Sequence, residues 1–253
     1  MEQPRSILIT GASSGIGAAL ARVFAAPGVA LALGGRDADR LAAVAASCRA
    51  RGAEVGVAVG DVADRAAVAG WVAAADEAAP LDLVIANAGI SAGTFGGGES
   101  AEQTRAILAA NLDGVVNTVL PAIPRLTERG RGQIALMSSL ASFRGFPGAP
   151  AYCASKAAVR VWGEALRGEL GPRGVGVTVV CPGFVASPMT AGNPYPMPLL
   201  MDADRAARLI RRGLARNRAR IAFPWPLLAA VWLLAALPPG LTDPLFARLP
   251  KKR

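Results

Sequence analysis

Short apolar runs alternate with longer alanine-rich segments along most of this chain. The intervening segments have the length and spacing of amphipathic helices, and one of them starts with Asp37 as a candidate N-cap and stops near Gly52. Continuously apolar strands separated by helices are typical of a parallel sheet covered on both faces. The pattern therefore predicts a single doubly wound α/β domain, with expected strands at residues 6–10, 29–35, 55–59, 81–87, 133–139 and 175–181.

Composition excludes several kinds of chemistry. The chain contains no histidine, so it has no Ser-His-Asp triad, no His-ligated zinc and no His general base. Its three cysteines, Cys48, Cys153 and Cys181, are widely spaced and form neither a disulfide framework nor a CxxC metal pattern. We expect buried thiols, no metal and a reducing cytoplasm. The apolar run at the N-terminus is also shorter than that of a signal peptide.

A glycine-rich turn joins the first expected strand to the first expected helix. The sequence TGASSGIG places Gly11, Gly15 and Gly17 where a tight bend lets a phosphate approach the backbone. The start of the following helix offers free N–H groups and a positive dipole end. A simple tight turn is the alternative, but the strand before and the helix after favour a dinucleotide site.

The end of the second expected strand bears on which dinucleotide binds. A site for NAD usually has an acidic residue here that holds the ribose hydroxyls. This chain has Gly35 followed by Arg36, whose guanidinium can pair with a 2′-phosphate. The sequence therefore favours NADP(H) over NAD(H). The alternative is that Arg36 is solvated and Asp37 holds the ribose.

Tyr152 and Lys156 stand four residues apart at the start of an expected helix. Four residues are about one helical turn, so both side chains leave the same face. A cation near a phenol favours the phenolate form. In a chain without histidine, this pair is the most credible device for proton transfer. The alternative is an ordinary surface pair four residues apart.

In order and spacing these motifs resemble those of the short-chain dehydrogenase/reductase family over about residues 5–190. Two positions depart from the family pattern: Ala86 replaces the first Asn of NNAG, and Ser187 replaces a Thr. The resemblance implies a Rossmann-type domain with a mostly parallel seven-stranded sheet and an NADP-dependent oxidoreductase that interconverts a carbonyl and an alcohol. It is carried by TGASSGIG (10–17), ANAG (86–89), Asn111, Ser139, YCASK (152–156) and CPGFVASPM (181–189).

The resemblance also implies roles for individual residues. Tyr152 is expected to be the general acid/base, with Lys156 favouring its phenolate and holding the nicotinamide ribose. Ser139 is expected to orient the substrate oxygen, and Asn111 to bind a water that links Lys156 to solvent. The implied cofactor-binding residues are Gly11, Ser13, Ser14, Gly15, Ile16, Gly17, Arg36, Asp61, Val62, Asn87, Ala88, Gly89, Tyr152, Lys156, Pro182, Gly183 and Val185.

The family pattern fades after residue 190, and the chain divides into a core at 1–190 and a substrate-covering C-terminal extension at 191–253. No charged residue occurs from Ile221 to Thr242, but prolines bracket an apolar stretch of only 11 residues, 227–237. A helix of that length covers about half of a hydrocarbon core. The alternatives are a helix that packs on the domain, lines the substrate entry or joins a partner subunit, shallow insertion in a membrane interface, or a true span.

Charge and aromatic residues give expectations about partners. Net charge is +9, and residues 201–253 hold 11 Lys or Arg against 3 Asp. These basic residues lack interleaved aromatics, so we expect no nucleic acid. A hydrophobic ketone, aldehyde or alcohol would suit an apolar crevice; side chains that would either line it or fill core are Phe143, Phe146, Phe184, Met197 and Trp225.

Assembly and catalysis each leave an alternative. The resemblance implies a homodimer or homotetramer built on helices near 104–126 and 152–170. A non-catalytic dinucleotide-binding sensor on the same fold is the alternative to an enzyme, because fold alone does not give function.

Overall fold

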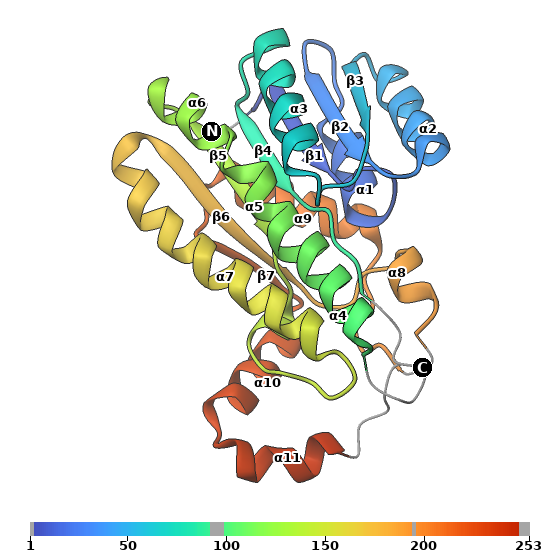
Figure 1. Cartoon of the computed structure of the whole chain (residues 1–253), viewed down its shortest axis with the longest axis vertical. Helices are drawn as coiled ribbons and strands as arrows, with labels where there is room; N and C mark the ends of the chain where they lie inside the picture. Colours follow the sequence, from blue (N-terminus) through green and yellow to red (C-terminus); the bar gives the residue numbers. More distant parts are fainter. Residues whose placement is uncertain (1–2, 92–98, 194–195, 248–253) are drawn as a thin grey trace.

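A computed structural model describes residues 3–91, 99–193 and 196–247 and shows one sheet in which every strand pairing is parallel (Figure 1). The first six strands match the apolar runs of the sequence to within about two residues at each end. The seven strands are β1 Ser6–Thr10, β2 Ala30–Gly35, β3 Glu54–Val59, β4 Leu83–Ala86, β5 Gly132–Met137, β6 Val175–Pro182 and β7 Arg220–Phe223.

The strand order is β3-β2-β1-β4-β5-β6-β7. The chain winds outward in one direction from β1 through β2 to β3, then returns to the other side of β1 with β4. In register, Ile9 of β1 stands beside Leu33 of β2 and Ile85 of β4. A sheet that reverses direction in this way forms a crevice beyond the carboxyl ends of the two strands that flank the reversal. The expected doubly wound fold is confirmed.

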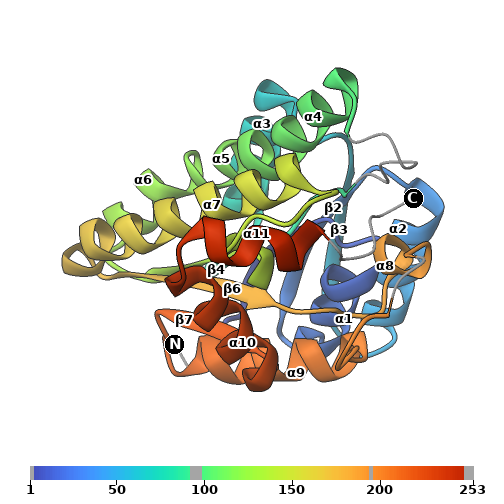
Figure 2. The same cartoon turned by 90° about the horizontal axis from the view of Figure 1, so that it is seen from below.

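Helices cover both faces of the sheet, as Figure 2 shows from below. Along β1 the buried side chains alternate between the faces: Ile7 and Ile9 join one core cluster and Leu8 the other. The Ile7 face packs against α1 Gly15–Phe24, α2 Ala38–Arg49 and α9 Ala203–Ala215. The Leu8 face packs against α3 Arg65–Ala78, α5 Gly114–Val119, α6 Ala122–Glu128 and α7 Pro150–Leu170.

Aspartates start three of these helices. The Asp37 carboxylate accepts a hydrogen bond from the Arg40 N–H at 2.9 Å, and Asp64 accepts one from Ala67 at 3.0 Å. Asp202 accepts from two N–H groups in the first turn of α9. Each bond satisfies a backbone donor that has no partner within its helix. Asp64 is therefore the cap of α3.

One continuous helical run, Ala101–Glu128, includes α4 Ala101–Leu108 and the π-helical turn Ala109–Asp113 as well as α5 and α6. By length and composition this run is the one segment among the described residues that is long enough and apolar enough to cross a membrane. Its buried side chains, among them Val115, Val119 and Leu126, belong to the core. We therefore assign it as a core helix.

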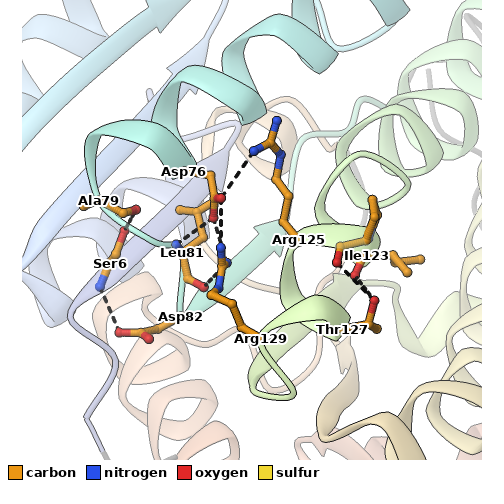
Figure 3. A network of polar contacts seen from close by, with 10 residues as sticks. Ser6, Asp76, Ala79, Leu81, Asp82, Ile123, Arg125, Thr127 and Arg129 are labelled. Carbon is orange, nitrogen blue, oxygen red and sulfur yellow. Dashed lines mark hydrogen bonds and ion pairs between the residues drawn. The ribbon is translucent and has the colours of Figure 1, made fainter.

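A buried ion-pair network joins α3, α6 and the start of β4 at the amino edge of the sheet (Figure 3). Asp76 is nearly buried, and its carboxylate oxygens lie 2.7 and 2.9 Å from the Arg129 guanidinium and 3.4 Å from that of Arg125. The Leu81 N–H donates to the same carboxylate at 2.9 Å. Burial alone would raise the pKa of Asp76, but these hydrogen bonds and positive charges outweigh it and lower the pKa.

The C-terminal extension contributes a strand and three short helices. Val180, Cys181 and Pro182 of β6 pair with Ile221, Ala222 and Phe223 of β7. The proline-bracketed stretch forms a helix, with Leu227 and Leu228 packed toward Leu140, Val179 and Cys181. The extension's helices are α9, α10 Trp225–Ala236 and α11 Pro239–Ala247, and α8 Pro188–Ala191 ends where the extension begins.

All three cysteines are buried thiols, as expected from the sequence. Burial raises the pKa of each: Cys48, Cys153 and Cys181. Among the described residues no group of three or more His, Cys, Asp or Glu side chains is placed to hold a metal ion.

Candidate functional site

The carboxyl ends of four adjacent strands bring predicted site residues together. Gly11 follows β1, Asn87 follows β4, Ser139 lies two residues beyond β5, and Pro182 ends β6. Thr10 ties the first two segments, because its hydroxyl accepts hydrogen bonds from the N–H groups of Asn87 at 3.0 Å and Ala88 at 3.1 Å. The crevice expected at the reversal of strand order is therefore lined by the residues that the sequence singled out.

The glycines of the first turn allow very close backbone packing. Gly11 has φ +66°, and a Cβ there would stand 2.7 Å from the Cα of Ala88. A Cβ on Gly17 would lie 2.2 Å from the carbonyl oxygen of Gly11. The side-chain amide of Asn87 donates to the carbonyl oxygens of Thr10 at 2.9 Å and Gly11 at 3.1 Å. The turn, the start of α1 and the segment after β4 thus form one packed unit.

The N-terminus of α1 points its free donors at this crevice. Ser14 is the N-cap residue but its side chain makes no capping hydrogen bond. Gly15 has φ +52°, and a Cβ there would approach the Cβ of Ser187 to 3.0 Å. Ser13 and Ile16 complete the turn between the glycines. Bare backbone at an uncapped helix start fits the pyrophosphate of a dinucleotide.

The predicted adenosine side lies at the ends of β2 and β3. A Cβ on Gly35 would contact the Ser13 side chain at 3.3 Å. The Arg36 side chain is 63% exposed and pairs loosely with Asp61, at 3.8 Å. Val62 packs against Gly114 of α5, where a Cβ would lie 2.5 Å from its methyl group. Arg36 is therefore free to turn toward an anionic group near Gly35.

The predicted catalytic pair leaves one face of α7. The Lys156 ammonium lies 5.8 Å from the centre of the Tyr152 ring and donates a hydrogen bond to the carbonyl oxygen of Met137 at 2.9 Å. Lys156 is buried, which favours its neutral form and lowers its pKa from 10.5 to about 8. Ser138, next to Ser139, donates to the Lys156 carbonyl at 2.7 Å and so fixes α7 to the end of β5.

Asn111 and Lys156 meet at Gly89. A Cβ on Gly89 would lie 2.9 Å from the Asn111 side-chain oxygen and 3.2 Å from the Lys156 ammonium. Asn111 sits in the π-helical turn, a conformation found often at functional sites. Its amide accepts from the Ile90 N–H at 2.7 Å and donates to the Ile90 carbonyl and the Ser155 hydroxyl. The side chain therefore anchors the segment after β4, a positioning role that the sequence did not indicate.

Ser139 opens a short 3₁₀ turn, Leu140–Ser142. Its hydroxyl accepts from the Ala141 N–H at 3.1 Å and lies 3.5 Å from the Pro182 carbonyl. On the Pro182 side, the Gly183 N–H donates to the Phe223 carbonyl at 2.7 Å, and Val185 bridges to Met201. The loop after β6, which carries Pro182, Gly183 and Val185, is thus tied to the extension.

An aromatic clamp follows Ser139. Two guanidinium groups lie over the Phe143 ring, that of Arg160 at 4.9 Å from the ring centre and that of Arg220 at 5.3 Å. Both arginines also pair with Glu164 of α7. Arginine over an aromatic face is attractive, and the shared carboxylate neutralises one of the two charges. The clamp joins the loop after Ser139 to α7 and β7.

A pocket of about 640 Å³ lies beside the predicted site. It is lined by the loop 141–147, by Asp243 of α11, and by Pro150, Cys153, Ala154 and Ala157 of α7. These α7 residues leave the helix on the side away from Tyr152 and Lys156. Phe143 and Phe146 line this pocket, and Trp225 is 77% exposed. These three aromatic side chains therefore do not form the substrate wall that the sequence suggested. Within the expected substrate-covering region 191–253, residues 194–195 and 248–253 lie outside the described residues.

Sequence reasoning missed three residues that hold the site together: Thr10, Ser138 and Ser155. The role of Thr10 could have been predicted, because Thr10 opens the TGASSGIG motif and ends the strand before the turn. Ser138 and Ser155 act through their neighbours Ser139 and Lys156, and nothing in their local sequence marks them.

The lowered pKa of Lys156 gives a pH dependence that can be measured. Between pH 8 and 10.5 the unfolded chain holds a proton on this side chain that the folded chain has lost. The free energy of unfolding therefore rises with pH across this window, by at most about 1.4 kcal/mol per unit. The rise should be absent in Lys156→Met, so the free energy of unfolding of the parent protein minus that of the variant, measured by urea unfolding at pH 7.5 to 10, should increase steadily with pH. Parallel curves would contradict a buried, easily deprotonated Lys156.

Comparisons with known proteins agree with this geometry. Residues 5–195 match the family model for short chain dehydrogenase. An uncharacterized oxidoreductase of Myxococcus xanthus is 40% identical over 246 residues, which cover 97% of each chain. A Sphingobium yanoikuyae short-chain dehydrogenase, solved in complex with NADPH, superimposes with TM-score 0.80 at 30% identity, covering 98% of this chain and 97% of that one.

A second solved structure contains the other dinucleotide. The short chain dehydrogenase of Mycobacterium paratuberculosis, bound to NAD, superimposes with TM-score 0.76 at 26% identity, covering 86% of this chain and 94% of that one. Similar folds thus bind either dinucleotide. With a matching family model over most of its length and the glycine turn, crevice and Tyr–Lys face in place, this chain belongs to the short-chain dehydrogenase/reductase family of NAD(P)-dependent oxidoreductases.

Proposed function

We propose that this oxidoreductase uses NADPH to reduce a hydrophobic ketone or aldehyde, or NADP⁺ for the reverse oxidation, with Tyr152 as the general acid/base. The observation that carries the proposal is the buried Lys156 ammonium above the Tyr152 ring at the carboxyl edge of the sheet. A buried cation is costly unless a developing negative charge stands near it. The phenolate of Tyr152 is the group placed to provide that charge.

The side chains of the site divide the work between proton transfer and positioning. Bound NADPH would supply the hydride. Tyr152 donates its phenolic proton to the substrate oxygen in reduction and accepts the alcohol proton in oxidation. Lys156 stabilises the phenolate through its positive charge, and the Met137 carbonyl holds the ammonium in place. Ser139, fixed by the N–H of Ala141, would donate a hydrogen bond that orients the substrate oxygen.

The preference for NADPH rests on the end of β2. Gly35 leaves no carboxylate to repel a 2′-phosphate, and Arg36 is exposed and only loosely paired with Asp61. Because relatives of this fold bind either NADPH or NAD, the preference must come from these local residues. Asp61 and Val62 would contact adenine from the end of β3.

The test measures consumption of NADPH and of NADH by the purified protein across ketones and aldehydes of increasing chain length. Turnover is expected with NADPH, rising with chain length as apolar surface is buried. Turnover with neither cofactor on any carbonyl, despite tight NADPH binding, would favour a non-catalytic sensor.

The role of Arg36 is tested by Arg36→Ala. Loss of the pairing with the 2′-phosphate should weaken NADPH binding about ten- to a hundred-fold and leave NADH binding nearly unchanged. Arg40→Ala is the matched control, since Arg40 is an exposed arginine four residues on that pairs with Asp37. Equal losses of affinity for NADPH and NADH, or a preference of the parent enzyme for NADH, would show that Arg36 does not bind the 2′-phosphate.

A further inference from the structure

The outward face of α10 is apolar and exposed. Trp225 is 77% exposed, Trp232 66% and Leu233 64%, and beyond the helix Leu241 is 70% exposed. The remaining exposed positions of the helix are alanine and proline, so this face offers water no polar side chain. Monomeric soluble domains rarely leave such contiguous apolar surface uncovered. We call Trp225, Trp232, Leu233, Leu237 and Leu241 the apolar patch.

The opposite side of α10 holds the patch firmly on the domain. Val231 is buried, and Leu227 and Leu228 pack against the cluster formed by Leu140, Val179 and Cys181. On α11, Thr242 is buried and Arg144 binds both Thr242 and Asp243 at 3.0 Å. The helix therefore needs no rearrangement to present its outer face. In an isolated interfacial helix the side opposite the apolar face is polar and solvated, whereas in α10 that side packs on the domain.

A dense group of arginines precedes the patch in the chain. Six exposed arginines occur within 14 residues on α9 and the following turn, and none of them has an ion-pair partner among the residues that the structure describes. Figure 2 places α9 and α10 along the same side of the molecule, at its lower edge. We call these residues the arginine row: Arg205, Arg208, Arg211, Arg212, Arg216 and Arg218.

We propose that the apolar patch and the arginine row together dock this protein on the surface of an anionic phospholipid membrane. Guanidinium groups attract anionic headgroups, and the indole and leucine side chains enter the boundary between headgroups and acyl chains. With 12 residues, α10 is about 18 Å long, short of the ~30 Å hydrocarbon core, so it lies in the interface and does not span it.

Charge argues against a second copy of the chain as the occupant. A two-fold interface brings the same surface of each protomer together, so the arginine row would face its own copy. Like charges so placed repel. Two acidic residues near the row could offset this repulsion, Asp202 and Asp204 at the start of α9. Of these, Asp204 is already paired with Arg22. An anionic lipid surface meets no such penalty.

Docking would also place the predicted site near the membrane. Leu227 at the start of α10 lies 3.0 Å from where a Cβ on Gly183 would stand, on the loop after β6. If the proposed function holds, an apolar substrate could then enter from the lipid side. The docking itself rests only on the patch and the row.

Vesicle flotation tests the proposal on the full chain. The protein is mixed with vesicles of phosphatidylcholine alone or of equal parts phosphatidylcholine and phosphatidylglycerol, at low and at high salt. We expect binding to the anionic vesicles that weakens at high salt, with a blue shift of tryptophan emission. Trp232→Ser/Leu233→Ser and Arg208→Gln/Arg216→Gln should each lose at least about ten-fold in affinity.

Val57→Ser/Val59→Ser is the matched control, because these valines are 48% and 60% exposed on β3, at the far edge of the sheet. Its vesicle binding should equal that of the parent protein. Absence of binding to anionic vesicles at low salt overturns the proposal. So does a patch variant that binds vesicles normally but changes the mass measured by light scattering, which would identify the patch as an interface between copies. NADPH turnover of each variant in detergent-free buffer, measured separately, reports on the proposed function alone.

Discussion

Replacing Tyr152 with phenylalanine is expected to lower turnover about a thousand-fold or more, because it removes the hydroxyl that the proposed function assigns to proton exchange with the substrate oxygen. The ring, its packing and the Lys156 ammonium 5.8 Å above it would all remain. The loss should therefore appear in the chemical step, with little change in cofactor affinity. Single-turnover oxidation of NADPH in the presence of excess ketone measures that step directly.

Two controls accompany this variant. NADPH binding, followed by its fluorescence, should stay within about three-fold of the parent value, because Tyr152 contributes only one of the many contacts to the cofactor. Thermal unfolding should also be nearly unchanged, since the phenylalanine ring fills the same space. A Tyr152→Phe protein that keeps near-normal turnover would remove Tyr152 from the mechanism and with it the role assigned to Lys156.

Asp76→Asn is expected to destabilise the fold by about 3 kcal/mol, the largest stability effect predicted here outside the site. The substitution keeps the shape of the side chain but removes the negative charge that Arg129 and Arg125 surround (Figure 3). Two partly buried guanidinium groups would then lose the carboxylate that pairs them, and Arg129 would keep only the attraction of the nearby charges of Asp82 and Glu128. Urea unfolding followed by circular dichroism measures the change.

The control for this prediction is the neighbouring Glu77→Gln, an exposed side chain on the same helix, which should stay within about 0.5 kcal/mol of the parent protein. Turnover per folded Asp76→Asn molecule should be normal, because the network lies at the amino edge of the sheet. The lowered pKa of Asp76 adds a pH signature: its contribution is complete above 3.8, the ordinary value, and disappears as pH falls below it. Equal stabilities at pH 7 would mean that the buried pairs contribute nothing net.

The sequence predicted those features that depend on local pattern. Each of the first six strands is an apolar run, because a parallel sheet covered on both faces buries both sides of its inner strands. The edge strand β3 is apolar too, although Val57 and Val59 are exposed. The aspartate cap at Asp37 follows from the same local logic. The glycine turn and the Tyr–Lys spacing were equally readable, since their chemistry depends on residues within one or two turns of each other.

Features that depend on distant partners could not be predicted. Strand β7 has only four residues, Arg220 and the first three residues of the uncharged stretch, and its pairing with β6 is what makes it a strand. Asp76 and Arg129 are 53 residues apart, so no local pattern connects them. Likewise, Trp225 was considered for the substrate wall but faces solvent, because the direction of α10 is set by Leu227, Leu228 and Val231 on its other side.

The clamp around Phe143 limits how this fold can be re-engineered. A chimera made by exchanging C-terminal segments would treat the tail as an independent module. Here Arg220 belongs to the tail, Phe143 to the loop after Ser139, and Arg160 and Glu164 to α7. A tail transplanted without its ring and carboxylate would leave Arg220 unpaired in the host. Segment exchange in this protein must therefore transfer Phe143, Arg160, Glu164 and Arg220 together.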